Sequence, residues 1–145
     1  MDVSALPPTG TCEVSTTGRR SGQTHRLEIW YVIVDEQIVL TGTPGNRHWL
    51  LNLRENPRAV LHLRGAAADH PMAATEVTDS GDRRRIAEQA WRLQPWYAEQ
   101  PFSLEDWVRG SPMVVLRPDG MPVAVEGSRL VAWSAELRRV HERLR

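Results

Sequence analysis

The sequence predicts a mainly β domain with peripheral helices (α+β), arranged as an antiparallel barrel. About five to seven segments rich in β-forming residues follow one another at hairpin spacing, with turn residues between them. Short helices interrupt this series instead of following every strand, which argues against a Rossmann sheet and for a barrel. The chain of 145 residues has room for one domain with a full core, so we expect a single domain over residues 1–145.

The first half of the chain supplies most of the predicted hairpins. Residues 1–10 are rich in proline and glycine and predict an irregular lead-in. A turn is expected over 17–23, and a break at Gly42–Gly45 precedes a helix over 47–55 that Asn46 is expected to cap. The strands predicted in this half are 11–16, 25–34, 38–41 and 58–63.

The second half mixes helices with strands. Asp79 or Ser80 is expected to cap the first helix here and Ser103 the second, with a kinked link over 95–100 between them. The three arginines at 83–85 are expected on a solvated helix face. The helices predicted in this half are 81–93, 104–109 and an amphipathic C-terminal helix over 129–145. The strands predicted here are 71–77, 112–116 and 123–125.

Composition excludes several classes of function. All 18 basic residues are arginine, and the absence of lysine rules out Schiff-base, pyridoxal phosphate and Walker-type phosphate chemistry. The formal net charge of zero argues against a general nucleic-acid or membrane-surface role.

Cys12 is the only cysteine, which excludes an internal disulfide and a cysteine-based zinc site and fits a cytoplasmic location. The scattered histidines lack metal-ligand spacing, so no metal site is expected. The longest apolar run, Ile29–Val34, is too short to span a membrane, and the first residues do not resemble a signal peptide.

The strongest local signal is the segment TTGRRSGQ at residues 16–23. Its two glycines allow backbone N–H groups to turn toward one point, beside two arginines and a serine, which suits an anion such as a phosphate. The alternative is a hairpin tip in which arginine only provides solubility. One charged hydrogen bond contributes roughly 1.5–3 kcal/mol, whereas micromolar binding needs about 8 kcal/mol. A ligand held here must therefore also bury a flat apolar body. The candidate walls are Trp30, Trp49, Trp91, Trp96, Tyr97, Phe102 and Trp107, most of which we expect in the core.

This segment, followed by a strand hairpin, a glycine-containing loop and WLLNLRENP at residues 49–57, resembles a known family. The pattern is similar to the deazaflavin-dependent nitroreductases and quinone reductases of the split β-barrel flavin/deazaflavin oxidoreductase superfamily, whose fold is FMN-binding-like. The resemblance runs from about residue 16 to residue 116. It implies that the barrel binds coenzyme F-420, with the arginine loop on the phosphate and acidic tail.

Carried over by position, the resemblance implies a set of site residues. The anion cradle would be Arg19, Arg20, Ser21, Gly22 and Gln23, with His25 in the place of a family arginine. The loop that approaches the deazaflavin ring would be Thr41, Gly42, Thr43 and Gly45, and the helix that supports it would contribute Trp49 and Asn52. The substrate pocket would be lined by Trp96, Tyr97 and Trp107.

The chain departs from the family pattern at several of these places. The loop after Thr41 is shorter than in the family, and it lacks the family's lysine and second glycine. Arg47 can supply the positive charge that the missing lysine would have given. Glu28 places a carboxylate near the expected pocket, with a solvent-facing strand glutamate as the alternative. No residue is identified as the proton donor.

The expected function is transfer of a hydride from reduced F-420 to a planar, electron-poor acceptor such as a quinone, enone or nitroaromatic. Such chemistry belongs to the cofactor, so the absence of a catalytic dyad in the sequence does not argue against it. The alternatives are an FMN-using reductase of the same fold and a non-catalytic barrel that binds an apolar ligand. A homodimer is also possible, because many barrels of this superfamily dimerise.

Overall fold

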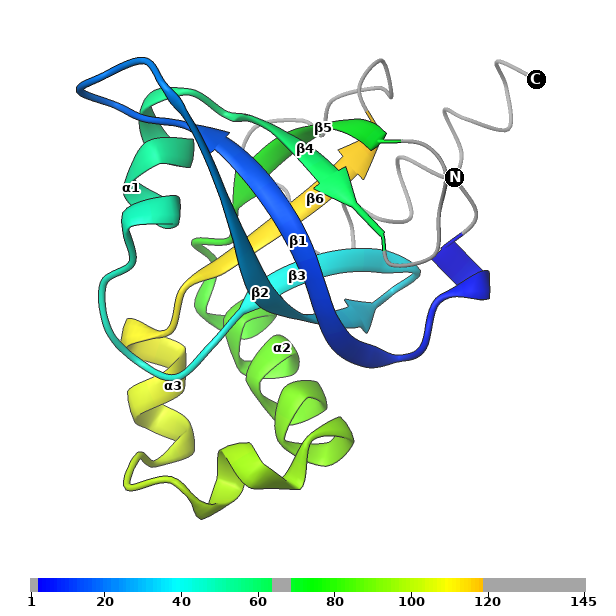
Figure 1. The fold of residues 1–145 in the computed structure, drawn as a ribbon. Coiled ribbons are helices and arrows are strands. Elements are labelled where there is room, and N and C mark those ends of the chain that lie inside the picture. Colours follow the sequence, from blue (N-terminus) through cyan, green and yellow to red (C-terminus); the bar gives the residue numbers. More distant parts are fainter. Residues whose placement is uncertain (1–2, 64–68, 119–145) are drawn as a thin grey trace.

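The computed structural model of the protein describes residues 3–63 and 69–118. Within these residues six antiparallel strands form a closed barrel in the order β1-β2-β3-β6-β5-β4 (Figure 1). Pairing of β1 with β4 closes the cylinder. The strands are β1 (Thr9–Thr17), β2 (Thr24–Val34), β3 (Gln37–Thr41), β4 (Arg58–His62), β5 (Asp69–Glu76) and β6 (Met113–Pro118). The predicted antiparallel barrel is confirmed.

The helices lie on two sides of this barrel. Helix α1 (His48–Glu55) inserts buried side chains into the core inside the barrel. Helix α2 (Ser80–Leu93), the 3-10 helix η2 (Pro95–Glu99) and α3 (Leu104–Gly110) pack against the outer face of β2, β3 and β6. Figure 1 shows α2 and α3 together, apart from α1. A short 3-10 helix η1 (Val3–Ala5) precedes β1 within the predicted lead-in.

The two-sided burial of β2 explains its continuous apolar run. Side chains alternate across a strand, so Ile29 and Tyr31 face the core inside the barrel, while Val32 and Val34 face the helical layer outside. Both faces are covered, as in strands buried on two sides. The apolar run Ile29–Val34 is thus part of a strand with one face in the core inside the barrel and the other in the core beneath the helices.

Two of the three helix-cap predictions are confirmed. Asp79 caps α2 by accepting a hydrogen bond from the backbone N–H of Asp82, and Ser103 forms a capping box with Asp106. The prediction for Asn46 is wrong. The residue at the cap of α1 is Arg47, in an extended conformation and without a side-chain cap. Because the helix begins one residue later than expected, Asn46 lies outside the capping position.

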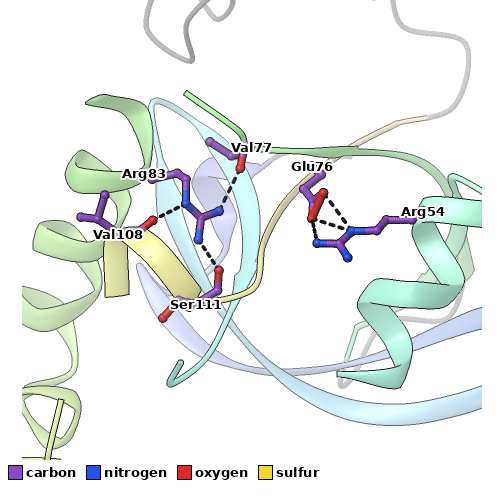
Figure 2. Close-up of polar contacts among 6 residues, drawn as sticks. All are labelled: Arg54, Glu76, Val77, Arg83, Val108 and Ser111. Atoms are coloured by element: carbon purple, nitrogen blue, oxygen red, sulfur yellow. Dashed lines mark hydrogen bonds and ion pairs between the residues drawn. The ribbon is translucent and has the colours of Figure 1, made fainter. Parts of the chain in front are cut away.

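The prediction of a solvated face for the arginines at 83–85 is wrong for Arg83. Its guanidinium donates to three backbone carbonyls, those of Val108 at 2.6 Å, Val77 at 2.9 Å and Ser111 (Figure 2). Val77 follows β5, whereas Val108 and Ser111 lie at the end of α3, so Arg83 joins two segments that meet beside α2. Arg84, by contrast, forms an exposed ion pair with Glu105. Helical spacing alone could not separate the two neighbours.

Some predictions lie outside the described residues. These are the strand over 123–125 and the helix over 129–145. Across 3–63 and 69–118, none of the helices has the length and apolar character needed to cross a membrane.

Candidate functional site

The turn between β1 and β2 is closed by its own hydrogen bonds. The N–H of Gly18 donates to the carbonyl of Gln23 at 2.7 Å, and the N–H of Gly22 donates to the carbonyl of Gly18 at 2.9 Å. The N–H of Gln23 donates to Oγ of Ser21 at 3.1 Å. Gly22 has a φ of +71°, a conformation that favours glycine. These three N–H groups are therefore occupied within the turn and are not available to an anion.

Asn52 on α1 connects this turn to the barrel. Its Oδ1 accepts hydrogen bonds from the backbone N–H of Arg19 at 3.1 Å and from Nη1 of Arg19 at 2.9 Å. Its Nδ2 donates to Oγ1 of Thr16 at 3.3 Å. Asn52 and Thr16 are both buried. The asparagine therefore holds the backbone and the guanidinium of Arg19 in one orientation.

The guanidinium of Arg19 also reaches the beginning of α1. Its Nη2 lies 3.3 Å from Nδ1 of His48. A guanidinium can only donate, so His48 accepts through Nδ1 and carries its proton on Nε2. Because Arg47 provides no side-chain cap, the first N–H groups of α1 have no capping side chain, and this end of a helix favours negative charge. His48 is a site residue that the sequence did not identify, because its partner is far away along the chain.

Further polar groups of the turn gather around Gly18. A Cβ at Gly18 would lie 2.7 Å from Nε2 of His25 and 2.7 Å from Oγ of Ser21, so a larger residue here would displace these two side chains. Arg20 and His25 are exposed. The described residues offer no hydrogen-bond acceptor to the guanidinium of Arg20. The turn thus presents a fixed cation, Arg19, beside groups that remain available to an anion.

The loop from Gly42 to Arg47 wraps around a second guanidinium. Arg47 donates to the carbonyl of Thr43 at 2.8 Å and to its Oγ1 at 3.3 Å. A Cβ at Gly42 would lie 3.3 Å from this guanidinium and one at Gly45 only 3.1 Å. Gly45 has a φ of +137° and its N–H donates to the carbonyl of Gly110 at 3.0 Å. The glycines in this loop are therefore needed for the approach of Arg47 and for the contact with α3.

Tyr97 is the centre of an aromatic cluster near Arg47. Its ring makes edge contacts with Trp30, Trp96 and Trp107 at centroid distances of 6.4, 5.8 and 4.7 Å. Burial raises the pKa of Tyr97 to about 12, opposed by the positive charge of Arg47. Its hydroxyl has no hydrogen-bond partner among the described residues.

The members of this cluster differ in exposure. Trp96 is 52% exposed and Trp30 is 40% exposed, whereas Tyr97 is buried and Trp107 is completely buried. Trp107 is therefore a core residue beneath the cluster and offers no surface to a ligand. Trp30, a candidate wall that the family pattern does not include, contributes an exposed face instead. The exposed edge of the cluster is made by Trp96 and Trp30.

The structure brings the predicted residues together in two groups, one at each side of the start of α1. The arginine turn meets α1 through Asn52 and His48, and the glycine loop meets it through Arg47. Trp49 is buried in the core inside the barrel and anchors the helix. Thr41 is buried in β3, and its Oγ1 has no partner among the described residues. Glu28 is exposed on β2.

Two cavities elsewhere contain none of the predicted site residues. One of about 320 Å³ lies between α1, β5 and β6, with the Arg54–Glu76 ion pair in its lining (Figure 2). The other, of about 400 Å³, lies between α2 and the turn after β2. No cluster of potential metal ligands occurs in the described part of the chain.

Comparison with known proteins agrees with the barrel. A family described as F-420H(2)-dependent quinone reductase matches residues 5–118. The chain belongs to this quinone reductase family. The match covers both loops, α1 and the aromatic cluster. No curated protein matches the chain.

Solved structures show the same fold at low sequence identity. A conserved hypothetical protein, Rv2991 from Mycobacterium tuberculosis, is 18% identical with a TM-score of 0.60, over 81% of this chain and 84% of that chain. A protein described as a domain-swapped dimer is 19% identical with a TM-score of 0.57, over 74% and 79% of the two chains. The heme storage protein HutZ from Vibrio cholerae is 15% identical with a TM-score of 0.55, over 75% and 81%. At these identities the likeness concerns the fold alone.

Proposed function

We propose that this member of the quinone reductase family uses reduced coenzyme F-420 to reduce a planar, electron-poor acceptor such as a quinone, enone or nitroaromatic in the cytoplasm. The observation that carries the proposal is the fixed guanidinium of Arg19, held by Asn52 and His48 beside the uncapped start of α1. An anionic tail requires such a prearranged positive site.

The residues of the arginine turn fit the anionic part of this coenzyme. Arg19 provides a charge whose orientation is fixed before binding, and Arg20 provides one that remains free to adjust. His25 and Ser21 place a ring nitrogen and a hydroxyl beside Gly18. Gly22 and Gln23 keep the turn closed through their N–H groups. Charge-assisted hydrogen bonds from several such donors are the strong ones in phosphate recognition.

The glycine loop and the aromatic cluster fit the flat part of the ligand. The loop from Gly42 to Gly45 has little side-chain bulk and allows a ring to approach the backbone. Exposed Trp96, supported by Tyr97, provides an aromatic surface on which a planar acceptor can stack. When bound, the deazaflavin supplies the hydride. The chain contributes alignment of the two planar molecules and exclusion of water.

A titration of the purified protein with F-420, followed by tryptophan fluorescence, tests this proposal. We expect saturable quenching in the micromolar range, and oxidation of reduced F-420 when a quinone is added. Arg19→Gln should weaken binding about tenfold or more, since loss of one charged contact costs roughly 1.5–3 kcal/mol. Arg92→Gln, a change on α2 away from the turn, is the matched control. Absence of binding at high micromolar F-420, or tighter binding of FMN in the same titration, would refute the proposal.

The resemblance to a heme storage protein supports a second candidate, a barrel that binds an apolar ligand without turnover. Steady-state assays with a panel of quinones and nitroaromatics separate the two, because a binder quenches fluorescence without consuming reduced coenzyme. The likeness to a domain-swapped dimer supports a homodimer, which light scattering of the full chain would test.

A further inference from the structure

Three side chains on the outer face of the barrel form a continuous hydrogen-bonded chain. Oγ of Ser15 lies 2.8 Å from Nε2 of His62, and Nδ1 of His62 lies 2.7 Å from Oδ1 of Asp69. An ionised carboxylate only accepts, so Nδ1 of His62 carries the proton and Nε2 accepts from the serine hydroxyl. This is the order of atoms through which a histidine activates a serine for nucleophilic attack.

The strands hold these residues in register. Val14 and Leu61 face the core inside the barrel, so the residues that follow them, Ser15 and His62, point to the outer face. His62 lies directly opposite Asp69 in the pairing of β4 with β5. The arrangement is therefore set by backbone pairing and does not depend on a loop.

The charges around this chain favour its active form. The hydrogen bond from His62, together with the positive charge of Arg26, holds the pKa of Asp69 below its ordinary value. Arg26 lies opposite Ser15 in the pairing of β1 with β2 and donates to Glu13 at 3.1 Å. Directly paired residues share one face of a sheet, so this guanidinium is on the same side as the serine. It can stabilise negative charge that develops on a carbonyl oxygen attacked by Ser15.

We propose that Ser15, His62 and Asp69 form a hydrolytic centre that cleaves small activated esters, independently of the reductase function. Ser15 Oγ forms a bond to the acyl carbon while its proton moves to Nε2 of His62. The bond from the acyl carbon to the leaving oxygen breaks, and that oxygen takes the proton from His62. Water then attacks the acyl-serine with His62 as base, which releases a carboxylic acid and restores the serine hydroxyl. The net reaction consumes one ester and one water.

The burial of Ser15 and His62 limits the substrate. Ser15 and His62 are each 8% exposed, whereas the side chain of Asp69 is 67% exposed. A large acyl group cannot reach so enclosed a hydroxyl, so the acyl group must be small, such as acetyl. Asp69 can be replaced without disturbing the core, because its side chain faces solvent.

Hydrolysis of p-nitrophenyl acetate by the full chain tests the proposal. We expect Ser15→Ala and His62→Gln to lower the rate to that of buffer, and Asp69→Asn to lower it about tenfold or more, the scale of general base catalysis. His70→Gln, a neighbouring histidine outside the hydrogen-bonded chain, should leave the rate unchanged. Circular dichroism of each variant shows whether it folds, and exposed Asp69 keeps the test valid if the buried variants do not.

Covalent labelling separates a serine nucleophile from general catalysis by surface histidines. Methanesulfonyl fluoride, whose sulfonyl group is about as small as an acetyl group, should modify the peptide that contains Ser15 in the wild type and fail to do so in His62→Gln. Modification at another residue, equal rates for wild type and Asp69→Asn, or a wild-type rate no higher than buffer would each overturn the proposal. None of these results depends on F-420.

Discussion

Oδ1 of Asn52 accepts hydrogen bonds from both the backbone N–H and Nη1 of Arg19, although Asn52 and Arg19 lie 33 positions apart in the chain. One amide oxygen therefore determines where the turn after β1 lies and where its guanidinium points. Recognition of an anion usually loses free energy in ordering a long arginine side chain. In the proposed anion site, Asn52 already orders the side chain of Arg19 before a ligand binds. The two arginines of the turn consequently differ in their expected contributions.

Arg19→Ala and Arg20→Ala should separate stability from binding. Arg20 is exposed, so its loss should change the free energy of unfolding by less than about 0.5 kcal/mol. Arg19→Ala removes one hydrogen bond to buried Asn52 and should cost about 1 kcal/mol. Both should weaken F-420 binding, Arg19→Ala more strongly. Urea denaturation measures the free energy of unfolding, and fluorescence titration measures F-420 binding. Equal effects of Arg19→Ala and Arg20→Ala on stability and on binding would contradict this account.

Tyr97→Phe should leave stability unchanged or raise it slightly. The buried hydroxyl has no partner among the described residues, so its removal leaves no group unsatisfied and relieves a desolvation cost. The edge contacts with the three tryptophans remain. If the hydroxyl contacts a bound acceptor, the same change should raise KM for that acceptor. A fall in the thermal midpoint would show that the hydroxyl is satisfied in solution.

Arg83→Met should destabilise the protein far more than Arg84→Met. Arg83 donates to three backbone carbonyls, one just after β5 and two at the end of α3. Hydrogen bonds to a charged group are worth roughly 1.5–3 kcal/mol each, so we expect a loss of about 3 kcal/mol or more. Arg84 forms only an exposed ion pair, for which less than about 1 kcal/mol is expected. Chemical denaturation of the two variants compares them directly, and similar values would contradict the role given to Arg83.

Gly45→Ala should disturb the loop around Arg47. The φ of +137° strains any L side chain, and the new Cβ would lie 3.1 Å from the guanidinium of Arg47. Strained backbone of this kind costs about 1–3 kcal/mol. Gly110→Ala is a useful control, since its Cβ would make ordinary contact at 3.7 Å with Pro44. A thermal midpoint equal to that of the control would argue against the strain.

Cys12 should resist thiol reagents in the native protein. Burial, assisted by the negative charge of Glu28, raises the pKa of its thiol to about 12. The thiolate is the reactive form, and its fraction is therefore very small at pH 8. Because this pKa is raised, the neutral thiol is the form that folding favours, and stability should fall as the pH rises from about 9, the ordinary value, to about 12. Ellman's reagent should label Cys12 in urea but not in buffer, whereas rapid labelling in buffer would contradict its burial.

The strands were predictable because their signal is local. Alternation and β-branched residues identify β2 and β3, and the pair of helix caps at Asp79 and Ser103 depends on residues three positions away. The ends of strands were less predictable, since pairing decides them. Thr9 and Gly10 extend β1 only because Val32 and Tyr31 of β2 lie opposite.

The sequence by itself determined an antiparallel barrel with short helices and pointed to an arginine turn and a tryptophan-asparagine helix as one site. Tertiary structure alone decided that Arg19 rests on Asn52 and His48, that Arg83 binds backbone carbonyls while Arg84 faces solvent, and that Trp107 is core while Trp96 is surface. The physical reason is the range of the interactions. Periodicity and capping act within a few residues, whereas the partner of a guanidinium or an indole is chosen by whichever distant segment the closed sheet brings beside it.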